Sequence, residues 1–364
     1  MMSNLAKESA MNRINALLDE NSFVEIGGLV TARSTDFNMQ DKVAASDGVI
    51  TGYGVIDNSL VYVYSQDASI LGGTVGEMHA KKISRLYDMA VKMGAPVVAL
   101  VDCAGLRLEE AADALNAFGE VYAKQAAASG VVPQITAVFG TCGGGMGVMA
   151  SLSDFTFMAE DGKLFVNAPN TLDGNRAEKC DTASAAYQAE VSGMADYTGT
   201  EDEVLAGIRQ LVSVLPMNND DFAEEQCADD LNRVCENLAD CVGDTEIALE
   251  NLADAGTFFE IKKAYAKNMV TGFMKLNGIT VGAVANRATV YDEEGKAEEL
   301  GTALTAEGCE KAADFVNFCD AFNIPVLTLT NASGFAATVD NEKRIAKAAA
   351  KLTYAYAEAT VPKV

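Results

Sequence analysis

The chain has 364 residues, enough for two domains that each bury a core; 49% of its residues are hydrophobic and 22% are charged. Its formal net charge of −25 argues against nucleic-acid binding, because such proteins neutralise phosphates with a basic surface. No apolar run approaches the roughly 20 residues that span a bilayer, and no signal peptide is recognisable. The eight cysteines include no Cys-x-x-Cys pair, which indicates a reduced, cytoplasmic protein without a zinc or redox motif.

The first half is predicted to open with a helix and a small β-meander. Residues 11–18 have the pattern of one amphipathic helix, and residues 23–26, 50–56 and 60–64 have the pattern of strands. The dipeptide Asp57-Asn58 separates the last two strands and is typical of a tight hairpin turn.

A helix and two buried strands follow the meander. The helix carries an apolar residue at every third or fourth position, at Ile83, Leu86, Met89, Ala90 and Met93. Gly94 then predicts a left-handed C-terminal cap, and Pro96 leads into a short apolar run typical of a buried strand. A second buried strand is predicted at residues 135–139.

The second half repeats this order. Strands are predicted at residues 258–261, 269–273 and 279–284, with an Asn277-Gly278 turn before the last of them. A helix with its own apolar stripe follows and ends at Asn323, which tolerates the left-handed backbone of a C-terminal cap. Alternating helices and strands after a meander predict an α/β layer architecture in each half.

An internal duplication explains this order. Pro96 recurs as Pro325 and Pro133 recurs as Pro362, an offset of 229 residues in both cases, with similar sequence around each landmark. The first copy continues from Pro133 into a glycine-rich loop, whereas the sequence ends two residues after Pro362. We therefore expect the second copy to be incomplete.

The domain boundaries follow from the repeat. We expect an N-terminal helix in residues 1–20, a first domain in 21–200, an acidic helical linker in 201–255 and a second, incomplete domain in 256–364. Part of the linker has the pattern of a helix with one apolar face, formed by Leu205, Ile208, Leu211, Val212 and Leu215.

Few side chains are candidates for chemistry. The sequence has one histidine, His79, so no Ser-His or Cys-His dyad can be built around any other imidazole. His79 itself is predicted to be structural or to lie at the rim of a ligand site. No metal-ligand spacing is present, and no carboxylate pair stands out from the acidic background. Chemistry is therefore expected from backbone groups or from a cofactor.

The glycine loop at residues 140–147 follows a predicted buried strand and precedes an apolar helix. Its peptide N–H groups suit an oxyanion hole, reinforced by the helix dipole. A dinucleotide-binding loop and a plain packing turn are the alternatives; the glycine spacing fits Gly-x-Gly-x-Gly and not the Gly-x-Gly-x-x-Gly of a dinucleotide site.

Two further loops, at residues 71–76 and 102–107, follow predicted strands. In open α/β sheets ligands collect at the carboxyl ends of strands, where these loops would lie. Arg107 would suit a phosphate, although a salt bridge to Glu109 or Glu110 is equally compatible with the local sequence.

These motifs resemble the biotin-dependent acyl-CoA carboxyltransferase family, which includes the β subunits of propionyl-CoA carboxylase and the carboxyltransferase subunits of sodium-pumping acyl-CoA decarboxylases. The resemblance runs from about Asn21 to the last residue. It is carried by Ser65-Gln66-Asp67, the loop from Leu71 to Glu77, the loop beginning at Gly140, and residues 315–325 and 354–364.

The resemblance implies a fold of two tandem crotonase-like domains and a homo-oligomer with active sites between the N-half of one protomer and the C-half of another. The N-half would receive the acyl-CoA, and the C-half would receive carboxybiotin on a carrier protein. In the family, N–H groups matching Gly144 and Gly145 stabilise the thioester enolate. The resemblance further assigns acyl-CoA binding to Gly72, Gly73, Ala104, Gly105 and Arg107.

The biotin side is assigned by resemblance to Gly334 and Phe335. The implied reaction moves a carboxyl group between carboxybiotin and the α-carbon of a short acyl-CoA, with the biotin nitrogen as the base and no metal. The partners would be a biotin carboxyl carrier protein together with a biotin carboxylase or a membrane decarboxylase subunit.

Alternatives to this carboxylase assignment remain open. The reaction can run in reverse, as in a sodium-pumping decarboxylase. Family chains also extend beyond the counterpart of Val364, so this sequence would lack the second glycine loop. A truncated, non-catalytic paralogue is therefore a further alternative.

Overall fold

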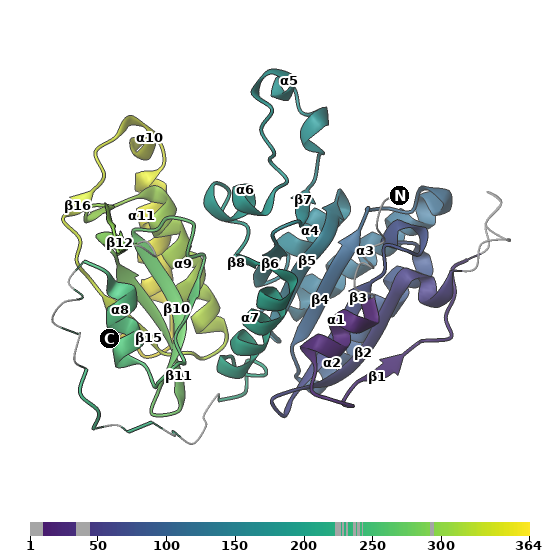
Figure 1. Cartoon of the computed structure of the whole chain (residues 1–364), viewed down its shortest axis with the longest axis horizontal. Coiled ribbons are helices and arrows are strands. Elements are labelled where there is room, and N and C mark those ends of the chain that lie inside the picture. Colours follow the sequence, from purple (N-terminus) through teal and green to yellow (C-terminus); the bar gives the residue numbers. More distant parts are fainter. Residues whose placement is uncertain are drawn as a thin grey trace. The chain divides into compact units, whose positions relative to one another are not determined.

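A computed structural model describes most of the chain and divides it into two compact units, Met1–Ser213 and Val214–Val364 (Figure 1). The described residues are 10–33, 44–222, 227, 229–230, 232–235, 238, 241, 243–291 and 295–364.

The first unit is built on a mixed sheet with the order β1-β2-β3-β4-β5-β6-β8. The first three strands form the predicted antiparallel meander and the later ones are parallel, while β7 pairs with the end of β5. The strands are β1 (Val24–Ile26), β2 (Val49–Ile56), β3 (Ser59–Gln66), β4 (Val97–Cys103), β5 (Gln134–Gly143), β6 (Phe155–Ala159), β7 (Lys163–Phe165) and β8 (Tyr197–Gly199).

Helices flank this sheet, and α2 and α3 pack against each other (Figure 1). The helices are α1 (Ala10–Leu17), α2 (Glu77–Met93), α3 (Ala111–Ala128), α4 (Gly145–Ser151), α5 (Asn175–Glu178), α6 (Ala185–Glu190) and α7 (Glu201–Val214). Short 3-10 turns, which include η2 (Ala45–Gly48), η3 (Leu71–Gly73) and η4 (Leu108–Glu110), lie in the loops.

The sequence pattern accounts for these elements. Every residue of β4 is buried, as an apolar strand inside a parallel sheet requires. Gly94 caps α2 with a φ of 64°, as predicted, and Asp57 and Asn58 form the hairpin turn with positive φ angles. The predicted apolar stripe of α2 is shorter than expected, because Met93 in its last turn is 58% exposed.

The second unit repeats the opening topology of the first. Its sheet has the order β9-β10-β11-β15, with an antiparallel meander followed by a parallel strand, as in β1-β2-β3-β4. The strands are β9 (Phe259–Ile261), β10 (Met269–Leu276), β11 (Ile279–Asn286), β12 (Thr289–Tyr291), β13 (Ala297–Glu299), β14 (Ala303–Leu304), β15 (Val326–Leu329) and β16 (Gly334–Phe335), and the helices are α8 (Thr245–Leu252), α9 (Ala306–Ala321), α10 (Val339–Glu342) and α11 (Ile345–Glu358).

The repeat extends to single hydrogen bonds. The Val97 N–H donates to the Pro133 carbonyl at 2.9 Å, and the equivalent Val326 N–H donates to Pro362 at 2.9 Å. In α2 and α9, a buried lysine at the same repeat position binds the segment between the first two strands of its meander. Lys82 donates to the carbonyls of Ser46 and Val49, and Lys311 donates to those of Lys262 and Tyr265.

The boundary between the compact units falls inside the segment predicted as a linker, 201–255. Helix α7 belongs almost entirely to the first unit, and its predicted apolar face is buried at Leu205 and Ile208. Several residues of the predicted acidic linker, and residues 1–9 of the predicted N-terminal helical segment, lie outside the described residues. The assignment of the four segments to functional domains stays a prediction.

Candidate functional site

Two of the three predicted ligand loops are joined by backbone hydrogen bonds. The Ala104 N–H donates to the Gly72 carbonyl at 3.1 Å, and the Val75 N–H donates to the Gly105 carbonyl at 2.9 Å. The Arg107 N–H in turn donates to the Val75 carbonyl at 2.9 Å. Loops 71–76 and 103–107 therefore form one rim at the carboxyl ends of β3 and β4.

The third loop joins this rim at the end of β5. Cys103 of β4 pairs in register with Cys142 of β5, which brings the following residues together. A Cβ added to Gly105 would lie 3.1 Å from the Gly143 carbonyl oxygen. Gly72 and Ala104 are exposed, while Gly144 is half-buried, so the edge where the loops meet is open to solvent.

The glycine loop turns sharply at Gly144. This residue has φ 61° and ψ −122°, a backbone conformation that side chains disfavour. Its N–H donates to the Phe165 carbonyl at 2.9 Å, so one of the two predicted oxyanion donors is engaged within the protein. Gly145 begins α4, where a peptide N–H has no intrahelical acceptor. The geometry therefore leaves the Gly145 N–H as the better placed donor.

Asp102 and Gly140 shape the approach to this loop. The pairing of β4 with β5 shifts its register between Val101 and Cys103, and the Asp102 carboxylate fills the irregularity and accepts the Thr141 N–H at 3.1 Å. A Cβ on Gly140 would overlap that carboxylate. Glycine is therefore required at position 140 for packing.

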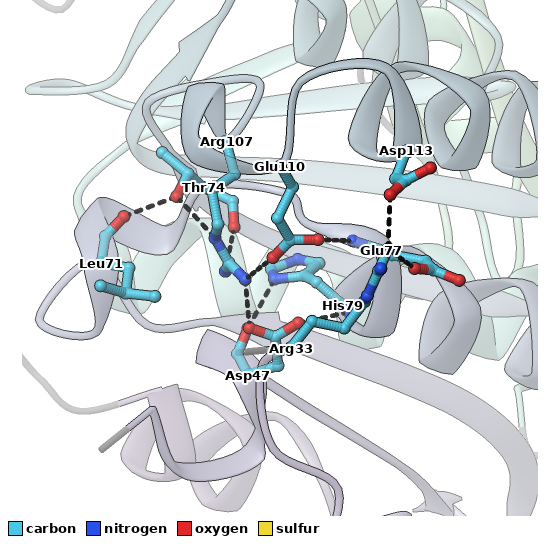
Figure 2. A network of polar contacts seen from close by, with 9 residues as sticks. All are labelled: Arg33, Asp47, Leu71, Thr74, Glu77, His79, Arg107, Glu110 and Asp113. Atoms are coloured by element: carbon cyan, nitrogen blue, oxygen red, sulfur yellow. Dashed lines mark hydrogen bonds and ion pairs between the residues drawn. The ribbon is translucent and has the colours of Figure 1, made fainter. Parts of the chain in front are cut away.

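Arg107 is buried beneath the loops and does not reach solvent, since its side chain is 1% exposed. Its guanidinium pairs with Asp47 and with Glu110, the latter at 2.8 Å, and donates to the Thr74 carbonyl at 2.7 Å (Figure 2). Of the two readings that the sequence left open, the salt bridge to Glu110 is the one present. Its guanidinium is engaged inside the protein and holds the loop that contains Thr74.

His79 is buried in the same region and is structural. Its Nδ1 lies 2.9 Å from the Asp47 carbonyl oxygen (Figure 2). A carbonyl can only accept, so Nδ1 carries the proton, and Nε2 accepts from the Gln66 amide at 3.0 Å. Burial, helped by the charges of Arg107 and Lys82, lowers the pKa of His79 to about 3. The imidazole is therefore neutral at physiological pH.

The thiols beside the loops are not activated. Burial raises the pKa of the Cys103 thiol to about 12 and raises that of Cys142 as well. Among the described residues no group of three or more histidine, cysteine or acidic side chains could hold a metal ion. No described helix is long and apolar enough to cross a membrane.

The predicted biotin-side residues lie in the second unit. Gly334 and Phe335 form β16, which pairs in parallel with β14. Gly334 has a φ of 140°, and no atom lies within 4 Å of the position that a Cβ would take there. The Phe335 side chain is 58% exposed.

Sequence reasoning missed Asp47 and Thr74 and gave no role to Gln66 beyond its place in a motif. The only local signal at position 47 is an Asp-Gly pair before a strand, which normally indicates a turn. Its partners lie far along the chain, so their pairing becomes visible only in the folded structure.

Comparison with known proteins identifies one family over almost the whole chain. A family model described as "Carboxyl transferase domain" matches residues 4–364. The propionyl-CoA carboxylase beta chain of Roseobacter denitrificans is 42% identical, over 98% of this chain and 71% of the relative. The methylmalonyl-CoA decarboxylase subunit alpha of Propionigenium modestum is 39% identical, over 98% of this chain and 70% of the relative.

A solved structure shows the same fold. The transcarboxylase 12S hexamer, solved with hydrolysed methylmalonyl-coenzyme A bound, matches with a TM-score of 0.89 and 34% identity, over 98% of this chain and 71% of that chain. This match confirms the predicted α/β, crotonase-like fold.

Proposed function

The chain belongs to the carboxyl transferase domain family and is a carboxyltransferase, and on this basis we propose that it moves a carboxyl group between carboxybiotin on a carrier protein and the α-carbon of a short acyl-CoA. Relatives named for propionyl-CoA and methylmalonyl-CoA, together with a similar structure that holds a methylmalonyl-CoA derivative, support a short acyl-CoA.

The observation that carries this proposal is the meeting of three loops beside the start of α4. Transfer at the α-carbon places negative charge on the thioester oxygen of an enolate. The Gly145 N–H, at the positive end of α4, is the group that would bind this oxygen, and the turn at Gly144 aims it. Gly72, Gly73, Ala104 and Gly105 would form the rim against which the acyl-CoA lies.

The base is proposed to come from outside the chain. His79 is neutral, buried and fully engaged, and the nearby thiols are protonated, so these side chains would not take the α-proton. Carboxybiotin, when its carrier docks, would supply the CO₂ unit and a basic ureido nitrogen. Gly334 and the exposed Phe335 would meet the biotin, because an open glycine beside an aromatic ring leaves room for a flat ring system.

The same step serves carboxylation and decarboxylation, and relatives of both kinds are similar to this chain at 42% and 39% identity. We propose carboxylation as the main direction and decarboxylation as the alternative. A biotin carboxyl carrier protein would be the partner in either case, with a biotin carboxylase or a membrane decarboxylase subunit as the third component. The hexameric transcarboxylase supports a homo-oligomer. The free state of all eight cysteines supports a reducing, cytoplasmic setting.

The test is calorimetric binding of acetyl-, propionyl- and methylmalonyl-CoA, with free coenzyme A as the reference ligand. A preference among the acyl groups would support the assignment, and no binding by folded protein would contradict it.

A matched pair of variants locates the site. Gly144→Ala and Gly256→Ala both place a methyl group in open space at a positive φ, 61° and 73°. Both substitutions therefore place a side chain on a backbone with a positive φ, without a steric clash. Only Gly144→Ala should impair acyl-CoA binding or turnover, and equal effects of the two variants would refute the location.

A further inference from the structure

Asp47 occupies a strained turn that the structure holds on both sides. Ser46 and Asp47 each have a φ of 52°, which is uncommon for non-glycine residues and persists only where the surroundings impose it. Lys82 provides this restraint by donating to the carbonyls of Ser46 and Val49. Backbone strain that the surrounding structure maintains is typical of functional sites, and here it falls on Asp47.

Asp47 joins two side chains that lead to different parts of the site. Its carboxylate is 0% exposed. One carboxylate oxygen pairs with Arg107, and the other accepts the backbone N–H of His79 at 2.7 Å (Figure 2). The Asp47 carbonyl also accepts the His79 Nδ1 proton at 2.9 Å. One residue thus binds both Arg107 and His79.

The Arg107 branch reaches the rim of the site. The guanidinium donates to the Thr74 carbonyl at 2.7 Å and to its hydroxyl at 3.3 Å, so it holds loop 71–76. It also pairs with Glu110, whose second oxygen accepts the Glu77 N–H at the start of α2 at 2.7 Å. Since Arg107 ends loop 103–107, this branch fixes both rim loops to each other.

The His79 branch reaches the glycine loop. Nε2 of the imidazole accepts from the Gln66 amide at 3.0 Å, and the same amide lies 3.8 Å from the sulfur of Met146. Met146 is the residue after Gly145 and is fully buried. This branch therefore runs from Asp47 to the residue beside the proposed oxyanion donor.

We propose that Asp47 is a positioning residue of the acyl-CoA site, which holds loops 71–76 and 103–107 and the start of α4 in one arrangement. The proposal rests on the function proposed above. Asp47 touches no substrate; it acts through Arg107 and His79. Its loss would shift the Gly145 N–H relative to the thioester oxygen, and misplacements near 1 Å cost about 100-fold in rate.

Asp47→Asn is the direct test. Asparagine retains an acceptor for the backbone N–H of His79 but removes the negative charge that pairs with the Arg107 guanidinium. Asp196→Asn is the matched control, because Asp196 is also a buried aspartate of the first unit and accepts a backbone N–H, that of Thr156, at 2.6 Å. A stabilising role without positioning predicts similar behaviour of the two variants once each is assayed well below its melting temperature.

The assay transfers the carboxylate of methylmalonyl-CoA to the ureido nitrogen of free biotin. The biotin N–H proton passes to the α-carbon, which gives propionyl-CoA and carboxybiotin. We expect Asp47→Asn to lower kcat about 50-fold with KM for the acyl-CoA changed less than about threefold, and Asp196→Asn to leave both near wild type. A kcat of folded Asp47→Asn within about threefold of wild type would overturn the proposal.

Arg107→Lys tests the positioning proposal if Asp47→Asn does not fold. Lysine keeps a charge for Asp47 and Glu110 but lacks the planar fork that also holds Thr74. A fall in kcat of about tenfold or more in folded Arg107→Lys supports the proposal, and wild-type kcat contradicts it.

Hydrogen–deuterium exchange separates this proposal from the function on which it rests. Asp47→Asn should speed exchange in peptides covering residues 71–76 and 140–147, whereas Asp196→Asn should not. Faster exchange in Asp47→Asn, found together with a wild-type protein that shows no turnover, would refute the proposed function and keep the coupling of the loops. Unchanged exchange in Asp47→Asn would refute the coupling, whatever the activity.

Discussion

Lowering the pH is expected to weaken the native state through a single imidazole, that of His79. The unfolded chain takes up a proton on this ring below about pH 6.5, whereas burial keeps the native ring neutral down to its pKa of about 3. The stability contributed by the neutral ring is therefore present above pH 6.5 and is lost as the pH falls toward 3. Each pH unit within this window costs about 1.4 kcal/mol, or about 2 kcal/mol between pH 6.5 and pH 5.

The cause of this shift is visible in the structure. The ring is buried, the charges of Arg107 and Lys82 oppose a second positive charge, and the Asp47 carbonyl offsets only part of this effect. The Nε2 atom already accepts a hydrogen bond from Gln66, so a proton there would break that bond.

Nitrogen NMR of ¹⁵N-histidine-labelled protein tests this prediction without assignment, because the chain has one histidine. The spectrum should show one neutral ring protonated at Nδ1 from pH 8 to pH 4. A ring that titrates near pH 6.5, or one protonated at Nε2, would refute the reasoning. Urea unfolding of wild type and His79→Gln at pH 7 and pH 5 gives the energetic counterpart, since the variant should lose about 2 kcal/mol less between these pH values.

Three further predictions concern stability. Ala111 has φ 45° and ψ −118°, so Ala111→Gly should relieve about 1 kcal/mol of strain and raise the melting temperature by a few degrees. No rise would show that the turn is unstrained. Burial raises the pKa of Asp154 to about 7, so the stability that its neutral form contributes is fully present below pH 3.8 and is lost as the pH rises through 7. Asp154→Asn should therefore flatten that part of a curve of unfolding free energy against pH. A variant curve parallel to wild type would contradict this. Gly140→Ala should destabilise by about 2–3 kcal/mol in chemical unfolding because its Cβ meets the Asp102 carboxylate, and a neutral effect would show that the carboxylate can move.

The effects of His79 and Asp154 run in opposite directions between pH 4 and pH 6.5. Acid weakens the native state through His79 and strengthens it through Asp154. The wild-type curve sums these two effects with those of the other shifted carboxyl groups, so only the difference between each variant and wild type isolates one group.

Local sequence patterns were sufficient to predict the scaffold. The cap at Gly94 and the hairpin at Asp57-Asn58 depend on neighbours within a few residues, and the structure confirms them. The apolar stripe of α2 is also local and is confirmed up to Ala90, whereas Met93 is exposed. Strand patterns and the Asn277-Gly278 turn predicted the second meander for the same reason. The rule that ligand loops gather at the carboxyl ends of strands also predicted that loops 71–76 and 102–107 would meet.

The hydrogen-bond partners inside the site could not be predicted in this way. Arg107 and Asp47 are 60 residues apart, and the choice among Asp47, Glu109 and Glu110 as partners depends on which carboxylate the fold buries beside the guanidinium. The Gly144 N–H was predicted as an oxyanion donor, but β7 supplies the Phe165 carbonyl that accepts it. That acceptor belongs to a strand whose pairing with β5 has no local signal.

Comparing the two copies of the repeat distinguishes residues that both copies share from residues found in the first copy alone. The lysine that restrains the segment between the first two strands of the meander is present in both copies, as Lys82 and Lys311, and makes the same kind of bonds to backbone carbonyls. At the same offset of 229, however, His79 falls on Gly308 and Arg107 falls on Ala336. The second copy instead buries a different arginine, Arg287, which pairs with Glu246 and Glu260. The network of His79 and Arg107 is therefore particular to the first copy and lies beneath loops of that unit that open to solvent, as a positioning role for Asp47 requires.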